Sequence, residues 1–234
     1  MLWMERLTLF SSLDLAALTS VLLTWLVIGY VIENPGKSWP SVSCLMAQYR
    51  HEWMVQMITR EPRIFDAQML SSLRQSTAFF ASATMIALGG GLAVLGNTEK
   101  LIGLATDLTN RTDPAIVWEL KMLLVLAFLV KAFFNFVWSN RLFGYCAVVM
   151  ASVPNNATDP NARPRATQAA DLNITAAHAF NRGLRATYFA LGSTAWLAGP
   201  LALMSSGALI AIILIRREFA SQSRRILMRD PTVL

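Results

Sequence analysis

Long, almost uninterrupted runs of apolar residues dominate the pattern of hydrophobic and polar positions along the chain. Three of these runs are clear, at about residues 13–32, 76–95 and 117–138. A helix of about 20 apolar residues is long enough to cross the roughly 30 Å hydrocarbon core of a bilayer. Trp118 and Trp138 lie at the two ends of the third run, where interfacial tryptophans are enriched. The pattern therefore predicts three membrane-spanning helices at these positions.

A fourth apolar run, residues 186–215, is too long for one straight span. A helix over its 30 residues would measure about 45 Å. Gly199 and Pro200 lie in the middle of the run, and this pair is typical of a helix break. The run is either one long kinked span or two short spans that form a hairpin.

The distribution of basic residues favours the hairpin. With a hairpin, fifteen of the 20 Lys and Arg residues fall on one side of the membrane and four on the other, while the last one, Lys131, lies inside a span. With a single span the two sides carry nine and ten, which gives no orientation. Cytoplasmic loops carry an excess of Lys and Arg. We therefore expect five membrane segments in a bacterial inner membrane, with the N-terminus outside and the C-terminus cytoplasmic.

Composition agrees with a membrane protein. Of the 234 residues, 55% are hydrophobic and 15% charged, with a mean hydropathy of +0.46. Soluble domains carry about 25% charged residues. The predicted fold class is all-α, a polytopic transmembrane helical bundle with cytoplasmic amphipathic helices. We expect one membrane domain over residues 1–234, with spans at about 13–32, 76–95, 117–138, 183–198 and 200–216 and cytoplasmic segments at 33–75, 141–182 and 217–234.

The cytoplasmic segments contain further helices. Residues 42–75 show helical spacing of Met46, Tyr49 and Trp53, with an expected break at Pro62 before a helix that leads into the second span. We expect the third helix to continue to about Val153, followed by a loop rich in Pro and Asn and by another helix from about residue 166.

Lys131 is the least expected residue of the third span, with Asn135 one turn further on. A lysine at the centre of a span costs about 2.5–3.5 kcal/mol on insertion scales. Its partner is a hydroxyl or carbonyl group of another span, a water-filled cavity, an anion or another subunit. Lys131 is therefore either a hydrogen-bonded structural lysine or, with Asn135, part of a polar path or ligand site.

The charged residues of the cytoplasmic segments form a second group of candidates. They are topology determinants that contact anionic lipid head groups, each worth about 1 kcal/mol near the surface, or they form an ion network or anion site. The candidates for that network are Arg50, Arg63, Asp66, Arg182 and Arg185. The net charge of +6 follows from the membrane topology, and no RNA-binding signature accompanies it, so we expect no nucleic-acid partner.

Residues that bind metals or catalyse reactions are sparse. His51-Glu52 resembles the start of a zinc-binding H-E-x-x-H motif, but Val55 stands where the second histidine would be. The cysteines Cys44 and Cys146 have no metal-type spacing. We expect no metal site, no cofactor and no enzymatic activity.

Four stretches resemble a known family. They are "YRHEWMVQM" (49–57), "RIFDAQML" (63–70), "FNRGLRATYFALGSTAWLAGP" (180–200) and "RREF" (216–219). Together the chain resembles the domain-of-unknown-function 599 family of integral membrane proteins over about residues 13–225. The resemblance implies a membrane fold and no mechanism. It also implies that Arg50, Trp53, Asp66, Arg182 and Arg185 belong to a family pattern. Asp66 with Arg63, or with Arg182, would make a cytoplasmic ion network.

Three functions follow as hypotheses. The first is a non-enzymatic scaffold or accessory subunit, in a homo-oligomer or a complex with other membrane proteins. The second is a homo-oligomeric channel or small transporter with a polar path near Lys131. The third, an intramembrane enzyme, is the least favoured, and it would show a convergent pocket containing His178, Asp171 or His51.

Overall fold

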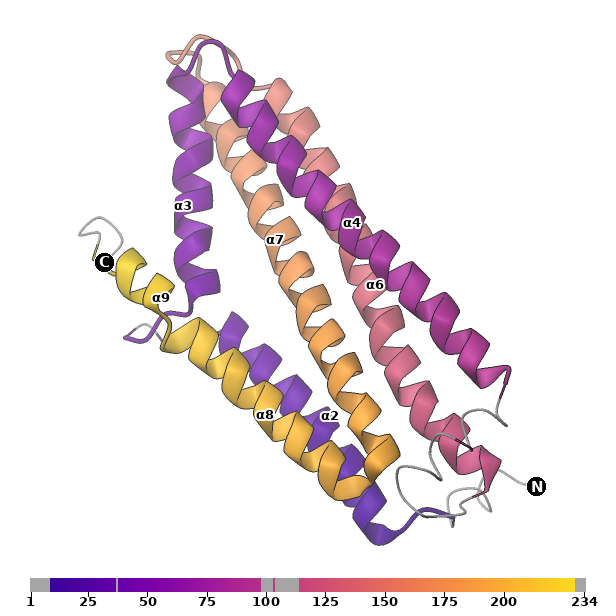
Figure 1. Cartoon of the computed structure of the whole chain (residues 1–234). Coiled ribbons are helices and arrows are strands. Elements are labelled where there is room, and N and C mark those ends of the chain that lie inside the picture. Colours follow the sequence, from indigo (N-terminus) through magenta and orange to yellow (C-terminus); the bar gives the residue numbers. More distant parts are fainter. Residues whose placement is uncertain (1–8, 37, 98–102, 104–113, 230–234) are drawn as a thin grey trace. The chain divides into compact units, whose positions relative to one another are not determined.

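The computed structural model describes residues 9–36, 38–97, 103 and 114–229, and most of these residues are helical, with no strand among them (Figure 1). The prediction of an all-α fold is therefore confirmed. The helices are α2 (Ser12–Glu33), α3 (Val42–Gln56), the 3-10 turn η1 (Met57–Thr59), α4 (Ile64–Leu95), α6 (Ala115–Ala151), α7 (Ala162–Ser193), the 3-10 turn η2 (Thr194–Ala198), α8 (Pro200–Phe219) and α9 (Gln222–Leu227).

Four of the described helical stretches are long and apolar enough to cross a membrane. They are α2, α4, α6 and the stretch Pro200–Leu227, which joins α8 and α9. Three of them contain the three clear apolar runs, and the fourth contains the predicted span 200–216. The remaining predicted span, 183–198, comprises the end of α7 and η2 and is not among these four. Its crossing of a membrane stays a prediction.

The break expected at Gly199-Pro200 is present. Gly199 has a φ of 129°, a left-handed conformation that favours glycine, and α8 begins at the next residue. Ser206 Oγ on α8 donates a hydrogen bond of 2.8 Å to the carbonyl oxygen of Gly192 on α7. A Cβ atom at Gly192 would lie 2.3 Å from a side-chain carbon of Ile210, so the two helices touch closely there. Residues 184–216 therefore form a helical hairpin.

The segments predicted to be cytoplasmic also follow the expected helices. α3 and η1 end before Pro62, and α4 runs without interruption from Ile64 through the second apolar run. α6 ends at Ala151, two residues before the expected end, and α7 begins at Ala162, four residues earlier than expected. Proline and the apolar runs are local signals, which explains why these boundaries were predictable.

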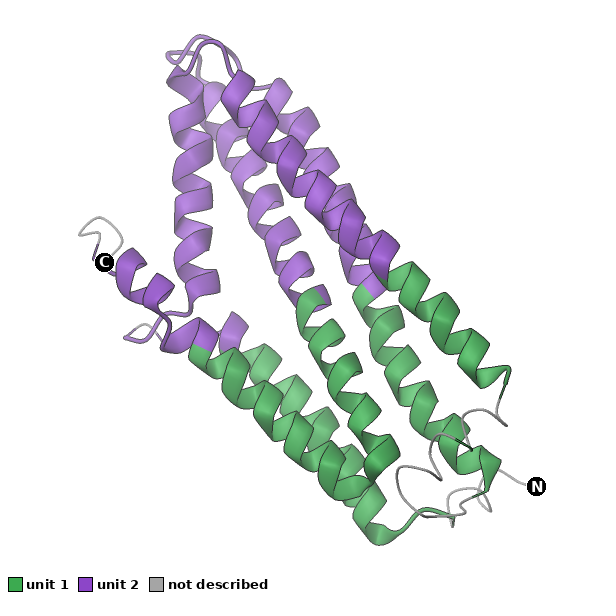
Figure 2. Cartoon of the chain, viewed as in Figure 1, with its two compact units in different colours: residues 1–31, 84–132, 184–216 green, residues 32–83, 133–183, 217–234 purple. Residues whose placement is uncertain are grey.

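The chain divides into two compact units (Figure 2). The first unit comprises residues 1–31, 84–132 and 184–216, and the second comprises residues 32–83, 133–183 and 217–234. α4, α6 and α7 each contribute one part to each unit.

Aromatic rings hold the first unit together. Phe128 on α6 lies between Trp25 on α2, with ring centroids 5.5 Å apart, and Phe189 on α7, at 5.8 Å. Near the start of α2, Trp196 Nε1 donates a hydrogen bond of 2.8 Å to Asp14 Oδ1. These contacts join α2 to α6 and to the first arm of the hairpin.

In the second unit, α6 and α7 pack in antiparallel orientation. Ser139 Oγ donates to the carbonyl oxygen of Ala176 at 2.7 Å, and Cys146 Sγ donates to that of Ala169 at 3.3 Å. A step of seven residues toward the C-terminus on α6 thus corresponds to a step of seven residues toward the N-terminus on α7. Small buried alanines on α7 permit this close approach, and α3 packs against the same helices in one apolar core.

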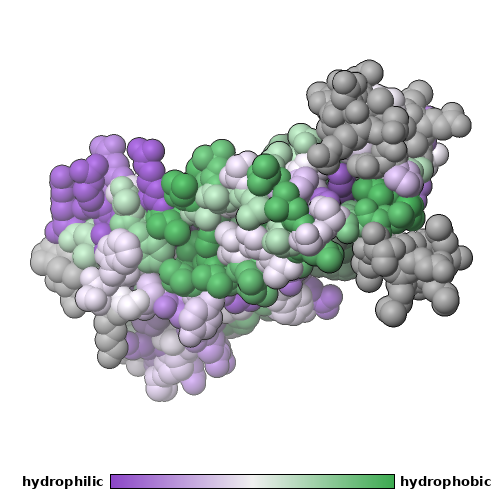
Figure 3. All heavy atoms as spheres, turned by 90° about the horizontal axis from the view of Figure 1, so that it is seen from below, coloured by the Kyte–Doolittle hydropathy of each residue, from purple (hydrophilic) through white to green (hydrophobic). Residues whose placement is uncertain are grey.

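Many large apolar side chains lie on the outside of the chain. Phe79 and Ile86 on α4 and Ile212 on α8 are more than half exposed. Figure 3 shows hydrophobic residues over a broad part of one face. Soluble proteins rarely expose large contiguous apolar surface. The exposed apolar side chains therefore agree with a chain that lies in a membrane.

Candidate functional site

A polar pocket lies in the second unit, where α2 ends and α6 and α7 pass. It has a volume of 470 Å³. Its lining consists of Glu33, Asn34, Asn135, Trp138, Thr175, His178, Ala179 and Arg182. We call this group the polar pocket.

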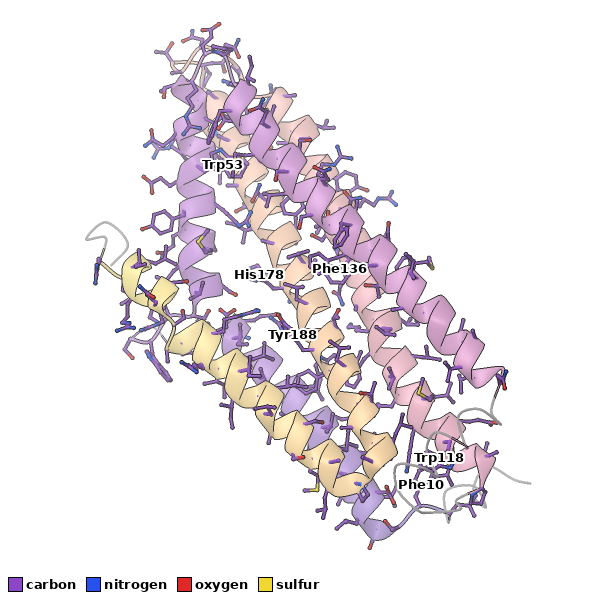
Figure 4. The ribbon with its side chains drawn as sticks, viewed as in Figure 1. Phe10, Trp53, Trp118, Phe136, His178 and Tyr188 are labelled. Carbon is purple, nitrogen blue, oxygen red and sulfur yellow. The ribbon has the colours of Figure 1, made fainter. Side chains whose placement is uncertain are left out.

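Helical spacing explains why these residues converge. Thr175, His178 and Arg182 are three and four residues apart, so they share one face of α7. Figure 4 labels His178 on this helix. Asn135 and Trp138 are three residues apart on α6. Glu33 is the last residue of α2, so its side chain lies where the apolar helix stops.

Arg182 and Glu33 form an ion pair in the pocket. Arg182 Nε donates to Oε1 of Glu33 at 2.9 Å and to Oε2 at 3.1 Å, and Nη2 donates to Oε2 as well. The hydrogen bond to Glu33 raises the pKa of Arg182 above its ordinary value. The Glu33 side chain is 18% exposed and that of Arg182 is 54% exposed. The pair thus borders the pocket with one charge of each sign.

The structure separates the two residues of the predicted polar path. Asn135 lines the polar pocket, whereas Lys131 is not among its lining residues. Lys131 is exposed and lies in the first unit, one turn before Asn135 on α6. Asn135 therefore borders polar residues of α7 and of the end of α2.

The predicted ion network is also divided among separate contacts. Asp66 is fully buried, and its Oδ1 accepts a hydrogen bond of 2.7 Å from Trp53 Nε1 and another from Arg60. The basic partner of Asp66 is therefore Arg60 and not Arg63 or Arg182, as the predicted ion network had it. Asp66 pairs with Arg60 because that residue lies just beyond the end of η1, beside the start of α4.

Arg63 and Arg50 bind uncharged acceptors. Arg63 Nη1 and Nη2 donate to the carbonyl oxygens of Val153 and Pro154, at 2.7 and 2.8 Å, and so hold the chain that follows α6. Arg50 Nη1 donates to Oδ1 of Asn173 on α7. Burial lowers the pKa of the Arg50 guanidinium below its ordinary value. Both arginines join helices of the second unit.

Arg182 and Arg185 lie on opposite sides of the boundary between the units. Arg185 is 5% exposed and belongs to the first unit, whereas Arg182 lines the polar pocket in the second. Of the five predicted network residues, Arg182 is among the described residues that line the pocket.

The C-terminal "RREF" stretch supplies a contact that the sequence pattern did not predict. Glu218 is 5% exposed, and its Oε2 accepts hydrogen bonds of 3.0 Å from both the backbone nitrogen and the hydroxyl of Ser43. Asn181 Nδ2 donates to the same hydroxyl at 3.3 Å. The N-terminal turn of α3 is thereby joined to α7 and α8.

Sequence reasoning missed three polar residues of the pocket, namely Glu33, Asn34 and Thr175, and it named His178 only under the enzyme hypothesis. The available signal was their position: Glu33 and Asn34 end the first apolar run, and Thr175 and His178 precede Arg182 on one helix face. Among the described residues, no group of three His, Cys, Asp or Glu side chains is placed to hold a metal ion. The expectation of no cofactor stays a prediction.

The fold and the pocket define an all-helical protein whose four long apolar stretches suit a membrane, with a polar pocket between three of its helices. The chain belongs to the family described as protein of unknown function, DUF599, whose model matches residues 16–223. The resemblance noted in the sequence is thus confirmed. No curated protein matches the chain, and no solved structure matches it.

Proposed function

We propose that this chain is a non-enzymatic integral membrane protein that acts as a subunit of a larger membrane assembly. The supporting observation is the position of Lys131. It is exposed in the middle of an apolar helix, and its neighbours on that face are exposed apolar residues. Val130, Phe134 and Val137 are 41%, 63% and 42% exposed.

Lipid is a poor cover for this face of α6. Trp138 is seven residues away, roughly 10 Å along the helix axis. Trp118 is 13 residues away, roughly 20 Å. An ammonium group held between these ends in hydrocarbon costs about 2.5–3.5 kcal/mol. Whatever Lys131 contacts within the chain, its exposed part is accommodated at lower cost by a neighbouring protein that offers hydroxyl or carbonyl oxygens, which favours a subunit contact on this face of α6.

The polar pocket offers little for catalysis. It contains His178, one of the three residues that the enzyme hypothesis named as alternatives for a convergent pocket, and Asp171 and His51 are not among its lining residues. Glu33 is the acidic residue of the lining, and Arg182 engages both of its carboxylate oxygens. A carboxylate engaged in this way is a weak general base, because the paired arginine stabilises its ionised form. This arrangement supports a non-enzymatic role.

Photo-crosslinking tests the subunit proposal. A benzophenone amino acid replaces Val130 or Phe134 in the native membrane, and Ile212 on α8, which is 62% exposed, is the matched control. We expect protein adducts at 130 and 134 and lipid adducts at 212. Mass spectrometry of the adducts then distinguishes a homo-oligomer from a complex with another membrane protein. Lipid adducts alone at 130 and 134 would refute the proposal.

A homo-oligomeric channel or small transporter is the second candidate. The observation that favours it is the place of Asn135 in a polar pocket rather than in lipid. Ion flux through proteoliposomes that contain the purified protein tests it. A channel should conduct, and Asn135→Leu should reduce the conductance. Flux equal to that of protein-free vesicles would count against this candidate.

A further inference from the structure

We propose that the polar pocket binds the head group of an aminophospholipid. The phosphate lies against Arg182 and His178, and the ammonium group lies against the carboxylate of Glu33. This site is independent of the subunit role, because Lys131 and the exposed face around it do not line the pocket.

The ends of three apolar segments coincide at this pocket. α2 ends at Glu33, the third apolar run ends at Trp138, and the predicted segment 183–198 begins directly after Arg182. These three residues all line the pocket. Three segments that stop being apolar at the same place mark the depth at which the hydrocarbon core meets the head groups. Trp138 is half exposed there, as expected of an interfacial tryptophan.

The charge of the pocket suits a zwitterion. Arg182 and Glu33 contribute formal charges that cancel, so a purely anionic ligand would bring a negative charge beside the Glu33 carboxylate. A head group that carries both a phosphate and an ammonium group matches both partners. The cytoplasmic arginines outside the pocket remain the expected contacts of anionic lipids.

The hydrogen-bonding groups of the pocket match the same ligand. Glu33 engages Nε and Nη2 of Arg182, which leaves the two N–H groups of Nη1 for a phosphate oxygen. An ethanolamine ammonium donates three N–H groups, and a carboxylate can accept several hydrogen bonds. Choline has no N–H group, so its lipids would lose the bond to Glu33.

The dimensions agree with a small head group. The volume of 470 Å³ lies within the range of about 300–1,000 Å³ that is common for small-molecule pockets. Asn34, Asn135 and Thr175 supply further uncharged polar groups for the rest of the head-group region.

Native mass spectrometry of the purified full-length protein tests the proposal. The protein in detergent is titrated with phosphatidylethanolamine, phosphatidylcholine or phosphatidylglycerol of identical acyl chains. We expect phosphatidylethanolamine to bind about tenfold more tightly than the other two, since a hydrogen bond between charged groups is worth about a factor of ten or more.

Two pocket variants assign the contacts. Glu33→Gln should abolish the preference for phosphatidylethanolamine and leave the affinity for phosphatidylglycerol at least as high. Arg182→Gln should weaken all three lipids about tenfold. Arg141→Gln is the matched control, because Arg141 contacts Tyr145 outside the pocket. It should leave the binding of phosphatidylethanolamine unchanged.

A third variant tests the pocket without removing the ion pair. If loss of the ion pair unfolds the protein, Thr175→Val keeps Arg182 and Glu33 together and should still weaken binding of phosphatidylethanolamine severalfold. Equal binding of the three lipids by the unmodified protein would overturn the proposal. A preference for phosphatidylethanolamine that survives Glu33→Gln would also overturn it. Displacement of the lipid by millimolar inorganic phosphate would assign the pocket to a soluble anion instead.

Discussion

Trp53 on α3 donates its indole N–H to Oδ1 of Asp66 on α4, at a distance of 2.7 Å. The two helices are joined through a turn that contains Pro62, and Arg60 in this turn pairs with the same oxygen. Asp66 is fully buried, and a buried carboxylate is costly unless it is paired and hydrogen-bonded. The contact therefore fixes the direction in which α4 leaves the turn.

Replacing Trp53 by Phe should destabilise the second unit. The change keeps an aromatic ring and removes one hydrogen bond to a charged acceptor, which is worth about 1.5–3 kcal/mol. The free energy of unfolding, measured from loss of helical circular dichroism in mixed micelles, should fall by about that amount. Glu52→Gln, at an exposed position of α3, should have no effect. If Trp53→Phe has the same free energy of unfolding as the unmodified protein, the hydrogen bond between Trp53 and Asp66 makes no net contribution to stability.

The packing of α6 on α7 predicts that Gly183 tolerates no larger residue. A Cβ atom at Gly183 would lie 2.6 Å from Cε1 of Phe136, whose side chain is fully buried. Forcing an extra carbon into a packed core costs about 1–3 kcal/mol. Gly183→Ala should therefore lower the midpoint of thermal unfolding.

Gly144→Ala is the matched control on α6. A Cβ atom there meets nothing within 4 Å, and alanine is a better helix former than glycine by about 1 kcal/mol. This variant should be neutral or slightly stabilised. A lower midpoint of thermal unfolding for Gly144→Ala than for Gly183→Ala would contradict the packing described for these helices.

The contact between Glu218 and Ser43 predicts a local effect on α3. Glu218→Ala removes both hydrogen bonds to Ser43 and leaves the first turn of α3 with an unsatisfied backbone N–H. Amide hydrogen exchange should accelerate in the first turn of α3, and Arg216→Gln, next to the same segment, should leave it unchanged. Exchange that rises evenly over the whole chain would point to global destabilisation instead.

The charge distribution predicts the topology. Single cysteines at Asn97, just after α4, and at Ser223, in α9, are introduced into a variant without Cys44 and Cys146. An impermeant thiol reagent should reach Asn97→Cys from outside and Ser223→Cys only after the membrane is opened. Labelling of both from the same side would contradict an odd number of crossings between them.

The helices and their breaks could be predicted because their signals are local. Apolar runs of sufficient length predict α2, α4 and α6, and Pro62 and the Gly199-Pro200 pair interrupt helices wherever they occur. Asn135 and Arg182 were also identified beforehand, Asn135 as a polar residue inside an apolar run and Arg182 as one of the basic residues outside the apolar runs. The fifth crossing and the orientation rest on charge counting and stay predictions.

The pairings could not be predicted in the same way. Glu33 and Arg182 are 149 residues apart in the sequence, and a carboxylate at the end of a span looks like any other helix end. Arg63, which resembled a partner for Asp66, binds carbonyl oxygens instead. The sequence offers several arginines as partners for each acidic residue, so composition does not identify the one that forms the ion pair.

The sequence by itself determined that this protein is helical, where its apolar segments begin and end, and where the last segment turns back. These properties depend on the neighbours of each residue along the chain. Only the tertiary structure decided that Arg182 meets Glu33, that Asp66 meets Arg60 and Trp53, and that Asn135 faces a polar pocket while Lys131 lies outside it. Those contacts depend on the rotation and register of packed helices, which many residues determine together.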